Sequence, residues 1–193
     1  MVGLESERRY TGVGCQLLNE NIIETIKDAE PFLSDPVYWM QEKKNGVRCL
    51  IQKEFYEVTG IGKKGFTMPL PPALEQTMRN LKDTTGEMKP STLLLDGELI
   101  DADYFAFDLI EYCGFDCRKE RYSNRHALLT ALLTGQEQGG LWLLPTFKTE
   151  DEKLRAFAKF MVQRPEGVVF KRHDAPYLPG RPEQGEGQRK FKF

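Results

Sequence analysis

The sequence lacks any long apolar run. No stretch approaches the ~20 consecutive apolar residues that a membrane-spanning helix requires, and the N-terminus has no apolar segment typical of a secretory signal. The composition is otherwise that of an ordinary globular protein, with 40% hydrophobic and 29% charged residues. Because neither secretion nor membrane insertion is indicated, we expect an intracellular protein, cytoplasmic or nuclear.

Histidine and cysteine are scarce as well. The chain has two histidines, and its four cysteines are scattered without the spacing of a disulfide framework. Cys113 and Cys117 are the only close pair, and a zinc site built on them is the alternative to plain free thiols. Reduced thiols in an intracellular protein are the simpler interpretation.

A strong excess of one charge is also missing. The net charge of −2 argues against a protein that coats nucleic acid non-specifically. From Arg164 onward, however, seven Lys and Arg residues stand against four Asp and Glu residues. This end is modestly basic, so a local basic groove is compatible with the composition.

Short strands and helices follow one another without the regular strand–helix alternation of a parallel sheet. Helices are predicted at residues 17–28, 72–81, after a Ser123 cap, and after the capping box of Thr149 and Glu152. Strands are predicted at 47–51, 55–59, 93–99, 104–109, 168–170 and 189–193, with a tight glycine-rich turn at 60–65 and a mobile surface loop at 176–187. This order favours an α+β fold with antiparallel sheets. We expect one domain over residues 1–193, with 1–36 as a helical lead-in.

The segment from Lys43 to Arg48 is the most informative one. It reads Lys-Lys-Asn-Gly-Val-Arg and follows the apolar residues 37–40. This order places a lysine at a strand end, followed by a glycine turn and an arginine. It suits a lysine that acts as a covalent nucleophile and faces a phosphate, provided that the lysine loses its proton. Strand alternation puts Gln41 and Lys43 on one face and Lys44 on the other. The alternative is a solvated turn lysine.

Four later segments carry the other groups that such chemistry requires. They are Asp96-Gly97-Glu98-Leu99, Phe105-Ala106-Phe107-Asp108, Glu166-Gly167-Val168-Val169-Phe170-Lys171 and Lys190-Phe191-Lys192. Asp96 and Glu98 share one strand face, which suits metal or ribose contacts, unless it is merely an exposed sheet edge. Lys190 and Lys192 also share a face, which suits a phosphate; the alternative is a frayed basic tail.

Together these five segments resemble the ordered motifs of the covalent nucleotidyltransferase superfamily, which includes ATP-dependent DNA ligases, RNA ligases and mRNA capping guanylyltransferases. The resemblance extends from about Trp39 to the C-terminus. It implies two antiparallel β-sheets flanked by helices around a nucleotide cleft, an ATP-grasp-like nucleotidyltransferase domain. It also implies ATP and Mg²⁺ as cofactors and nicked or broken DNA or RNA as the partner. Lys43 would form a lysyl-AMP, AMP would pass to a 5′-phosphate, and a 3′-hydroxyl would seal the strand.

The resemblance also implies a role for each matching residue. Lys43 is the nucleophile, and Lys190 and Lys192 stabilise the transition state. The implied nucleotide contacts are Gln41 near the adenine, Phe107 stacked on the purine, Arg48 on the ribose, Lys63 on sugar or phosphate, Lys171 on phosphate, and Glu98 and Glu166 on nucleotide and metal. For Lys63, in Gly62-Lys63-Lys64-Gly65, a plain hairpin turn is the alternative. Strict strand alternation would place Glu166 and Lys171 on opposite faces of the strand. A local bend at Gly167 would turn Glu166 toward the face of Lys171.

Two departures from the family pattern leave alternatives open. Asn45 stands where the family has an aspartate; its amide keeps hydrogen bonds but loses the charge. The chain could therefore adenylylate itself and seal slowly, or be a catalytically impaired nucleotide-binding module, and a guanylyltransferase using GTP is a further alternative. Only Phe193 follows Lys192. We therefore expect no C-terminal OB-fold, with a separate domain or protein supplying that surface.

Overall fold

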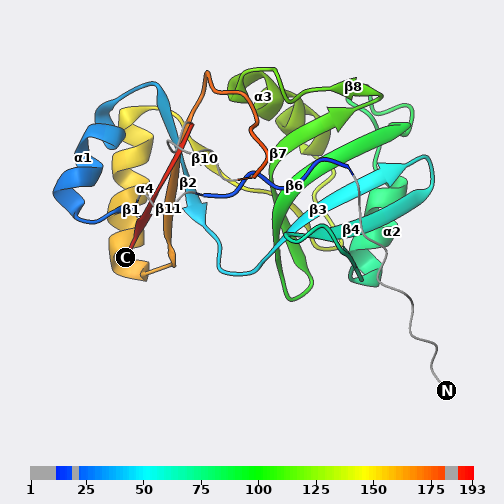
Figure 1. Ribbon diagram of the computed structural model, residues 1–193, viewed down its shortest axis with the longest axis horizontal. Coiled ribbons are helices and arrows are strands. Elements are labelled where there is room, and N and C mark those ends of the chain that lie inside the picture. The colour runs from blue at the N-terminus through cyan, green and yellow to red at the C-terminus, as the bar shows by residue number, and fades with distance from the viewer. Residues whose placement is uncertain (1–11, 19–21, 181–186) are drawn as a thin grey trace.

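Two β-sheets lie side by side, each with its own helices (Figure 1). The computed structural model describes residues 12–18, 22–180 and 187–193. The elements are β1 (Ile22–Ile23), α1 (Ile26–Ser34), β2 (Tyr38–Lys43), β3 (Val47–Glu54), β4 (Glu57–Gly62), β5 (Thr67–Met68), α2 (Pro72–Asn80), β6 (Thr92–Ile100), β7 (Asp103–Tyr112), β8 (Phe115–Asp116), α3 (Tyr122–Leu133), β9 (Leu141–Leu143), β10 (Thr146–Phe147), α4 (Glu150–Gln163), β11 (Gly167–Arg172) and β12 (Gln188–Lys192).

The smaller sheet has the strand order β1-β12-β11-β2-β10, and α1 and α4 cover one of its faces. The apolar side chains of that face, among them Met40, Val168, Phe170 and Phe191, pack against the helices. Because successive strand side chains alternate between faces, the opposite face carries the residues in between. Lys43, Gly167 and Lys192 lie in one row across β2, β11 and β12.

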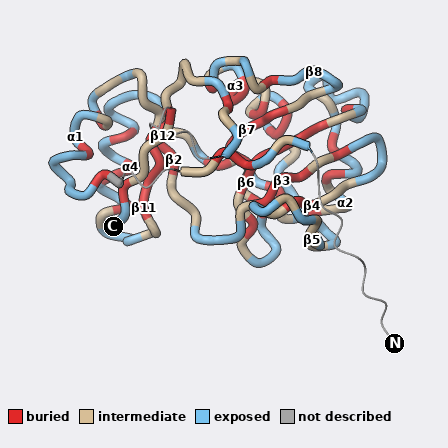
Figure 2. The backbone as a smooth tube through the Cα atoms, in the orientation of Figure 1, coloured by how far each residue is buried: buried red, intermediate tan, exposed pale blue. Residues whose placement is uncertain are grey.

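The larger sheet has the order β5-β4-β3-β6-β7-β8, with β9 beside β7. Helices α2 and α3 pack on one face and bury an apolar core that includes Ile51, Leu95 and Leu129. The buried segments run along the central strands of both sheets (Figure 2). The described pairings are antiparallel except β1 with β12 and β7 with β9. The expected α+β architecture of two antiparallel sheets flanked by helices is therefore confirmed.

The predicted position of the first helix, residues 17–28, is wrong. Ile22–Ile23 form strand β1, which pairs in parallel with Lys190 and Phe191, and the helix starts only at Ile26. Thr25 sets this start, because its side chain accepts a hydrogen bond from the Asp28 amide as an N-cap. Residues 1–11 and 19–21 of the predicted lead-in lie outside the described residues.

Three smaller predictions also need correction. Ser123 is not a cap, because α3 begins at Tyr122 and Arg121 occupies the N-cap position without a side-chain bond. The glycine turn is shorter than predicted, since β4 continues to Gly62. The described part of the supposed mobile loop is anchored: Tyr177 is buried, and Gly180 donates to the Cys15 carbonyl at 2.9 Å. Its residues 181–186 lie outside the described chain. The capping box of Thr149 and Glu152 is confirmed.

Gly167 is required by the close approach of β11 to β12. A Cβ at this position would lie 2.0 Å from the Phe191 carbonyl oxygen. We expect Gly167→Ala to force the two strands apart and lower the free energy of unfolding by about 1–3 kcal/mol, measured by urea denaturation. Gly62→Ala is the matched control, because a Cβ there meets nothing closer than 3.7 Å. Equal costs for the two substitutions would contradict the steric argument.

Candidate active site

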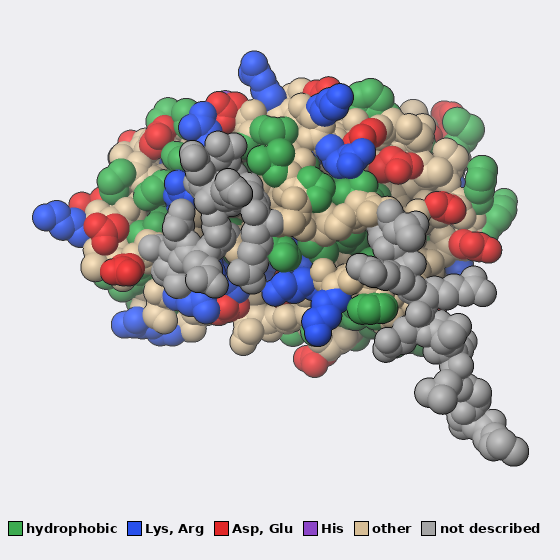
Figure 3. Space-filling view, in the orientation of Figure 1, with side chains coloured by type: hydrophobic (Ala, Val, Ile, Leu, Met, Phe, Trp, Pro, Cys, Tyr) green, Lys and Arg blue, Asp and Glu red, His purple; other side chains and the backbone are tan. Residues whose placement is uncertain are grey.

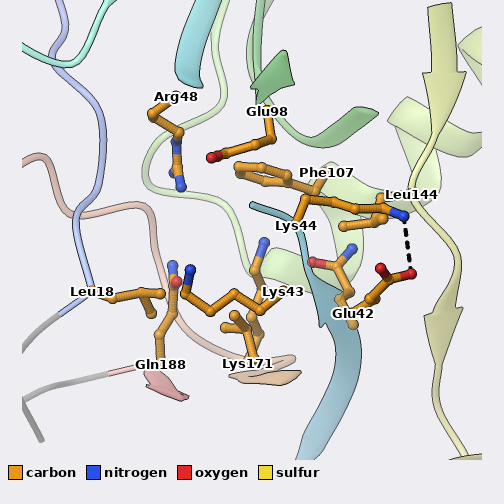
Figure 4. Close-up of a pocket in the computed structure, with 12 residues that line it drawn as sticks. Leu18, Glu42, Lys43, Lys44, Arg48, Glu98, Phe107, Leu144, Lys171 and Gln188 are labelled. Carbon is orange, nitrogen blue, oxygen red and sulfur yellow. Dashed lines mark hydrogen bonds and ion pairs between the residues drawn. The ribbon is translucent and has the colours of Figure 1, made fainter. Parts of the chain in front are cut away.

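A solvent-open pocket lies between the two sheets and encloses about 440 Å³ of empty space. Figure 4 shows its lining side chains converging from both sheets. The lining residues are Leu18, Gln41, Glu42, Lys43, Lys44, Arg48, Glu98, Phe107, Leu144, Val169, Lys171 and Gln188. Six residues predicted for the site are therefore brought together: Gln41, Lys43, Arg48, Glu98, Phe107 and Lys171.

Lys43 forms an ionic cluster at the pocket edge. Its Nζ lies 2.5 Å from Oε2 of Glu166, and the other carboxylate oxygen, Oε1, lies 3.4 Å from Nζ of Lys192. The sheet register explains the cluster, because Gly167 pairs with Lys43 on one side and with Lys192 on the other. Glu166 immediately precedes β11, so strand alternation does not govern its direction. Its carboxylate bridges two of the predicted lysines.

Lys44 departs from the predicted geometry, because it too lines the pocket. Its Nζ is 2.9 Å from Glu42 and 4.5 Å from the centre of the Phe105 ring. β2 ends at Lys43, so alternation no longer applies to the next residue. The adjacent Asn45 is exposed in the turn between β2 and β3.

Arg48 is held in place by Asp96. Two guanidinium nitrogens each lie 2.6 Å from a carboxylate oxygen of Asp96, in the bidentate geometry that arginine favours. Tyr177 donates its hydroxyl to the same carboxylate at 2.7 Å, and burial raises the pKa of Tyr177, which keeps the hydroxyl a donor. Asp96 is thus a fully buried support for Arg48. The contribution of Tyr177 was missed, because the tyrosine lies in a Gly/Pro-rich segment far away in sequence.

Besides Glu42, which pairs with Lys44, Glu98 is the second carboxylate that lines the pocket. It accepts a hydrogen bond from the Gly46 amide at 3.2 Å, and burial raises its pKa. The described residues contain no group of three or more His, Cys, Asp or Glu side chains that could enclose a metal ion. Mg²⁺ is commonly held by one or two carboxylates together with substrate phosphates, and Glu98 fits that kind of site. Glu166 is already engaged by two ammonium groups.

Phe107 is surrounded by positive charge. Nζ of Lys171 and Cζ of Arg48 each lie 4.3 Å from its ring centre. Lys171 is only 5% exposed and also faces the ring of Tyr122 at 4.8 Å. Burial lowers the pKa of Lys171 to about 7, so its amine changes charge near neutral pH. Phe107 and Lys171 therefore lie together in the pocket lining, and their contact with a nucleotide stays a prediction.

Gln41 is 2% exposed and has a partner that was not predicted. Its amide nitrogen donates to Oγ1 of Thr146 at 2.8 Å, and the same oxygen lies 2.8 Å from Nε2 of His126. β10 places Thr146 directly opposite Gln41. A polar residue that faces a strand partner leaves no local pattern in the sequence, so neither Thr146 nor His126 could be found in advance.

Besides Glu166, three further predicted residues lie outside the pocket lining. Lys63 is exposed in the turn after β4. Lys190 is half-buried on β12, in register with the pocket-lining Val169. Lys192, with a half-exposed side chain, reaches the pocket edge through Glu166. In Figure 3, Lys and Arg side chains gather along the lower middle of the molecule, on the side where the two sheets meet.

Comparison with known proteins agrees with this geometry. Residues 100–192 match the family model described as "ATP dependent DNA ligase domain". A search of curated proteins gave no match. No helix among the described residues is long and apolar enough to cross a membrane.

The fold resembles that of solved DNA ligases. A mycobacterial DNA ligase D complexed with ATP and MES superposes with a TM-score of 0.67 at 19% identity, over 93% of this chain and 60% of that chain. The ligase domain of M. tuberculosis LigD gives a TM-score of 0.66 at 20% identity, over 93% of this chain and 59% of that chain. The ATP-dependent ligase of bacteriophage T7, in complex with ATP, gives 0.58 at 12% identity, over 89% and 67%.

The chain spans about 60% of the two mycobacterial structures. At these identities the superpositions establish the fold, and the family match covers its C-terminal half. These findings show that the chain has the nucleotidyltransferase fold of ATP-dependent DNA ligases, and that its residues 100–192 match the ATP-dependent DNA ligase domain family.

Proposed function

We propose that this chain is the adenylylating part of an ATP-dependent polynucleotide ligase that acts on DNA. Lys43 takes AMP from ATP as a lysyl-AMP, and the AMP is then passed to the 5′-phosphate of a broken strand. A 3′-hydroxyl displaces AMP and seals the break. The family description favours DNA over RNA as the partner.

The observation that carries the proposal is the position of the Lys43 amine. It lies in the pocket between the two sheets, within hydrogen-bond distance of Glu166, and Lys192 contacts the same carboxylate. Phosphoryl-type transfer depends on positioning and charge neutralisation more than on acid–base groups. A lysine amine beside a carboxylate and a second ammonium meets that need.

The first step is a displacement at phosphorus. The Lys43 nitrogen forms a bond to the α-phosphorus, the bond from that phosphorus to the β-phosphate oxygen breaks, and pyrophosphate leaves. The ammonium proton must be lost first, and Glu166, 2.5 Å away, can accept it. Lys190 and Lys192 neutralise the charge that grows on the phosphate oxygens.

The remaining groups bind the nucleotide. Phe107 offers its ring to the purine, and Arg48 and Lys171 bring two cations to that ring for ribose and phosphate oxygens. Glu98 would hold Mg²⁺ jointly with the phosphates, and Glu166 would join it only after passing the Lys43 proton to solvent and releasing its ammonium partners. Bound there, Mg²⁺ neutralises phosphate charge. Lys63 is exposed on the turn after β4, outside the pocket lining, so it would reach a nucleotide only from the rim.

Asn45 affects the later steps in this proposal. It lies exposed beyond the end of β2, where an amide cannot provide the charge of the usual aspartate. The first step uses Lys43, Glu166 and the β12 lysines and does not need that charge. We therefore expect adenylylation to proceed and strand sealing to be the slower reaction.

Covalent labelling tests the function. The purified chain is incubated with Mg²⁺ and either ATP or GTP labelled at the α-phosphate, and is then run on a denaturing gel. We expect label from ATP that is lost in acid, as a phosphoramidate is, and no label from ATP labelled at the γ-phosphate. Labelling by GTP alone would indicate a guanylyltransferase. Binding of ATP without labelling would indicate an impaired nucleotide-binding module.

A further inference from the structure

The orientation of the Gln41 side-chain amide is fixed by a chain of hydrogen bonds behind it. An amide has one end that donates and one that accepts, and the two differ in what they recognise. Gln41 lines the pocket, and its Nε2 is turned to Oγ1 of Thr146 at 2.8 Å. Its oxygen, Oε1, is therefore the end left for a ligand.

His126 determines what the Thr146 hydroxyl can do. Oγ1 of Thr130 donates to the His126 backbone carbonyl at 2.8 Å, so this oxygen is an acceptor for Nδ1 of the ring at 3.3 Å. With its proton on Nδ1, the ring presents a bare Nε2 to Thr146, 2.8 Å away. Burial, assisted by Lys148 and Lys171, lowers the pKa of His126 to about 4, so the ring is neutral under ordinary conditions.

The Thr146 hydroxyl has two acceptors within reach, Nε2 of His126 at 2.8 Å and the Leu144 carbonyl at 3.3 Å, and its one proton goes to the nearer His126. It can accept a hydrogen bond from Gln41 but cannot also donate one to it. The reverse amide orientation would set two acceptors, Oε1 and Oγ1, against each other at 2.8 Å inside a buried site. An unsatisfied buried polar contact of this kind is costly.

We propose that Thr146, oriented by His126, is a positioning residue that makes Gln41 a hydrogen-bond acceptor and so selects adenine over guanine. The 6-amino group of adenine donates to Oε1, whereas the 6-oxygen of guanine would face it as a second acceptor. This inference rests on the proposed use of the pocket for a nucleoside triphosphate. It adds two residues, on α3 and β10, that act without touching the nucleotide.

Two substitutions remove the constraint on the orientation of the Gln41 side-chain amide, each in a different way. Thr146→Val keeps the shape but removes the acceptor for Nε2. His126→Phe keeps a ring against Trp39 and Tyr122 but leaves the Thr146 hydroxyl free either to accept from Nε2 or to donate to Oε1. Thr146→Ser retains the hydroxyl and is the rescue variant.

The measurement is the ratio of ATP to GTP labelling of the purified chain. Because partial unfolding lowers both signals together, the ratio reports on selection of the base. We expect Thr146→Val and His126→Phe each to lower the ratio about tenfold, and Thr146→Ser to leave it within about twofold of the unaltered chain. Equilibrium binding of ATP and GTP, measured by calorimetry, provides a second readout that requires no covalent step.

The outcomes separate this inference from the proposed chemistry. Labelling by ATP with a ratio unchanged in both variants would overturn the inference and leave the function standing. Absent labelling, with tighter binding of ATP than GTP that both variants erase, would support the inference and overturn the chemistry. If neither nucleotide binds, the inference and the proposed function are both contradicted.

Discussion

Lys43→Ala is expected to reduce covalent labelling by α-labelled ATP to background, a loss of more than about a thousandfold. The substitution removes the nitrogen that bonds to phosphorus. The Glu166 carboxylate that paired with it keeps only Lys192. ATP binding should persist, because Phe107, Arg48 and Glu98 line the pocket independently of this amine. Labelling is read on a denaturing gel, and binding by calorimetry.

Lys44→Ala is the matched control. Lys44 is the next residue and lines the same pocket, but its ammonium pairs with Glu42 and lies over Phe105. Such a partly exposed pair contributes little, so labelling should fall by less than about tenfold. Labelling that survives Lys43→Ala and disappears in Lys44→Ala would transfer the nucleophile to the neighbouring residue and contradict the assignment.

Much of the site could be predicted because strand alternation carries its geometry. A face of β12 that buries Phe191 must present Lys190 and Lys192 on the other side, and β2 must present Gln41 and Lys43 together. Motif order then suggested that these faces share a cleft. The sequence could not supply the register that sets Gly167 between Lys43 and Lys192, because pairing between strands is a long-range property.

The errors arise where two local interpretations compete. Ile22 and Ile23 fit a helical pattern, yet the edge of β12 provides a backbone partner that makes them a strand. Asp96 shares a face with Glu98, but only the fold shows that Arg48 and Tyr177 engage it. Thr146 and His126 belong to no motif, and they reach Gln41 only because β10 closes the sheet beside β2.

Asp108 is the residue whose loss should cost the fold most. Its carboxylate accepts two hydrogen bonds from Arg125, at 2.7 and 2.9 Å, and both side chains are 2% exposed. The guanidinium also donates to the carbonyls of Glu120 and Ala175, so it joins β7, α3 and the segment after β11. Asp108→Ala leaves a buried cation without its counter-charge, which we expect to lower the free energy of unfolding by about 3–5 kcal/mol.

Asp116→Ala tests whether burial is the cause. Asp116 and Arg118 form a similar two-bond pair, but their side chains are 51% and 41% exposed, so water replaces the lost partner and the expected cost is below about 1 kcal/mol. Both variants are compared by urea denaturation.

Replacing the whole buried pair, with Asp108→Leu and Arg125→Met, should recover much of the loss, because no unpaired charge then remains. If Asp108→Ala and Asp116→Ala lower the free energy of unfolding equally, the Arg125 guanidinium is stabilised by other groups. The Asp108–Arg125 pair would then not be what joins the larger sheet to α3.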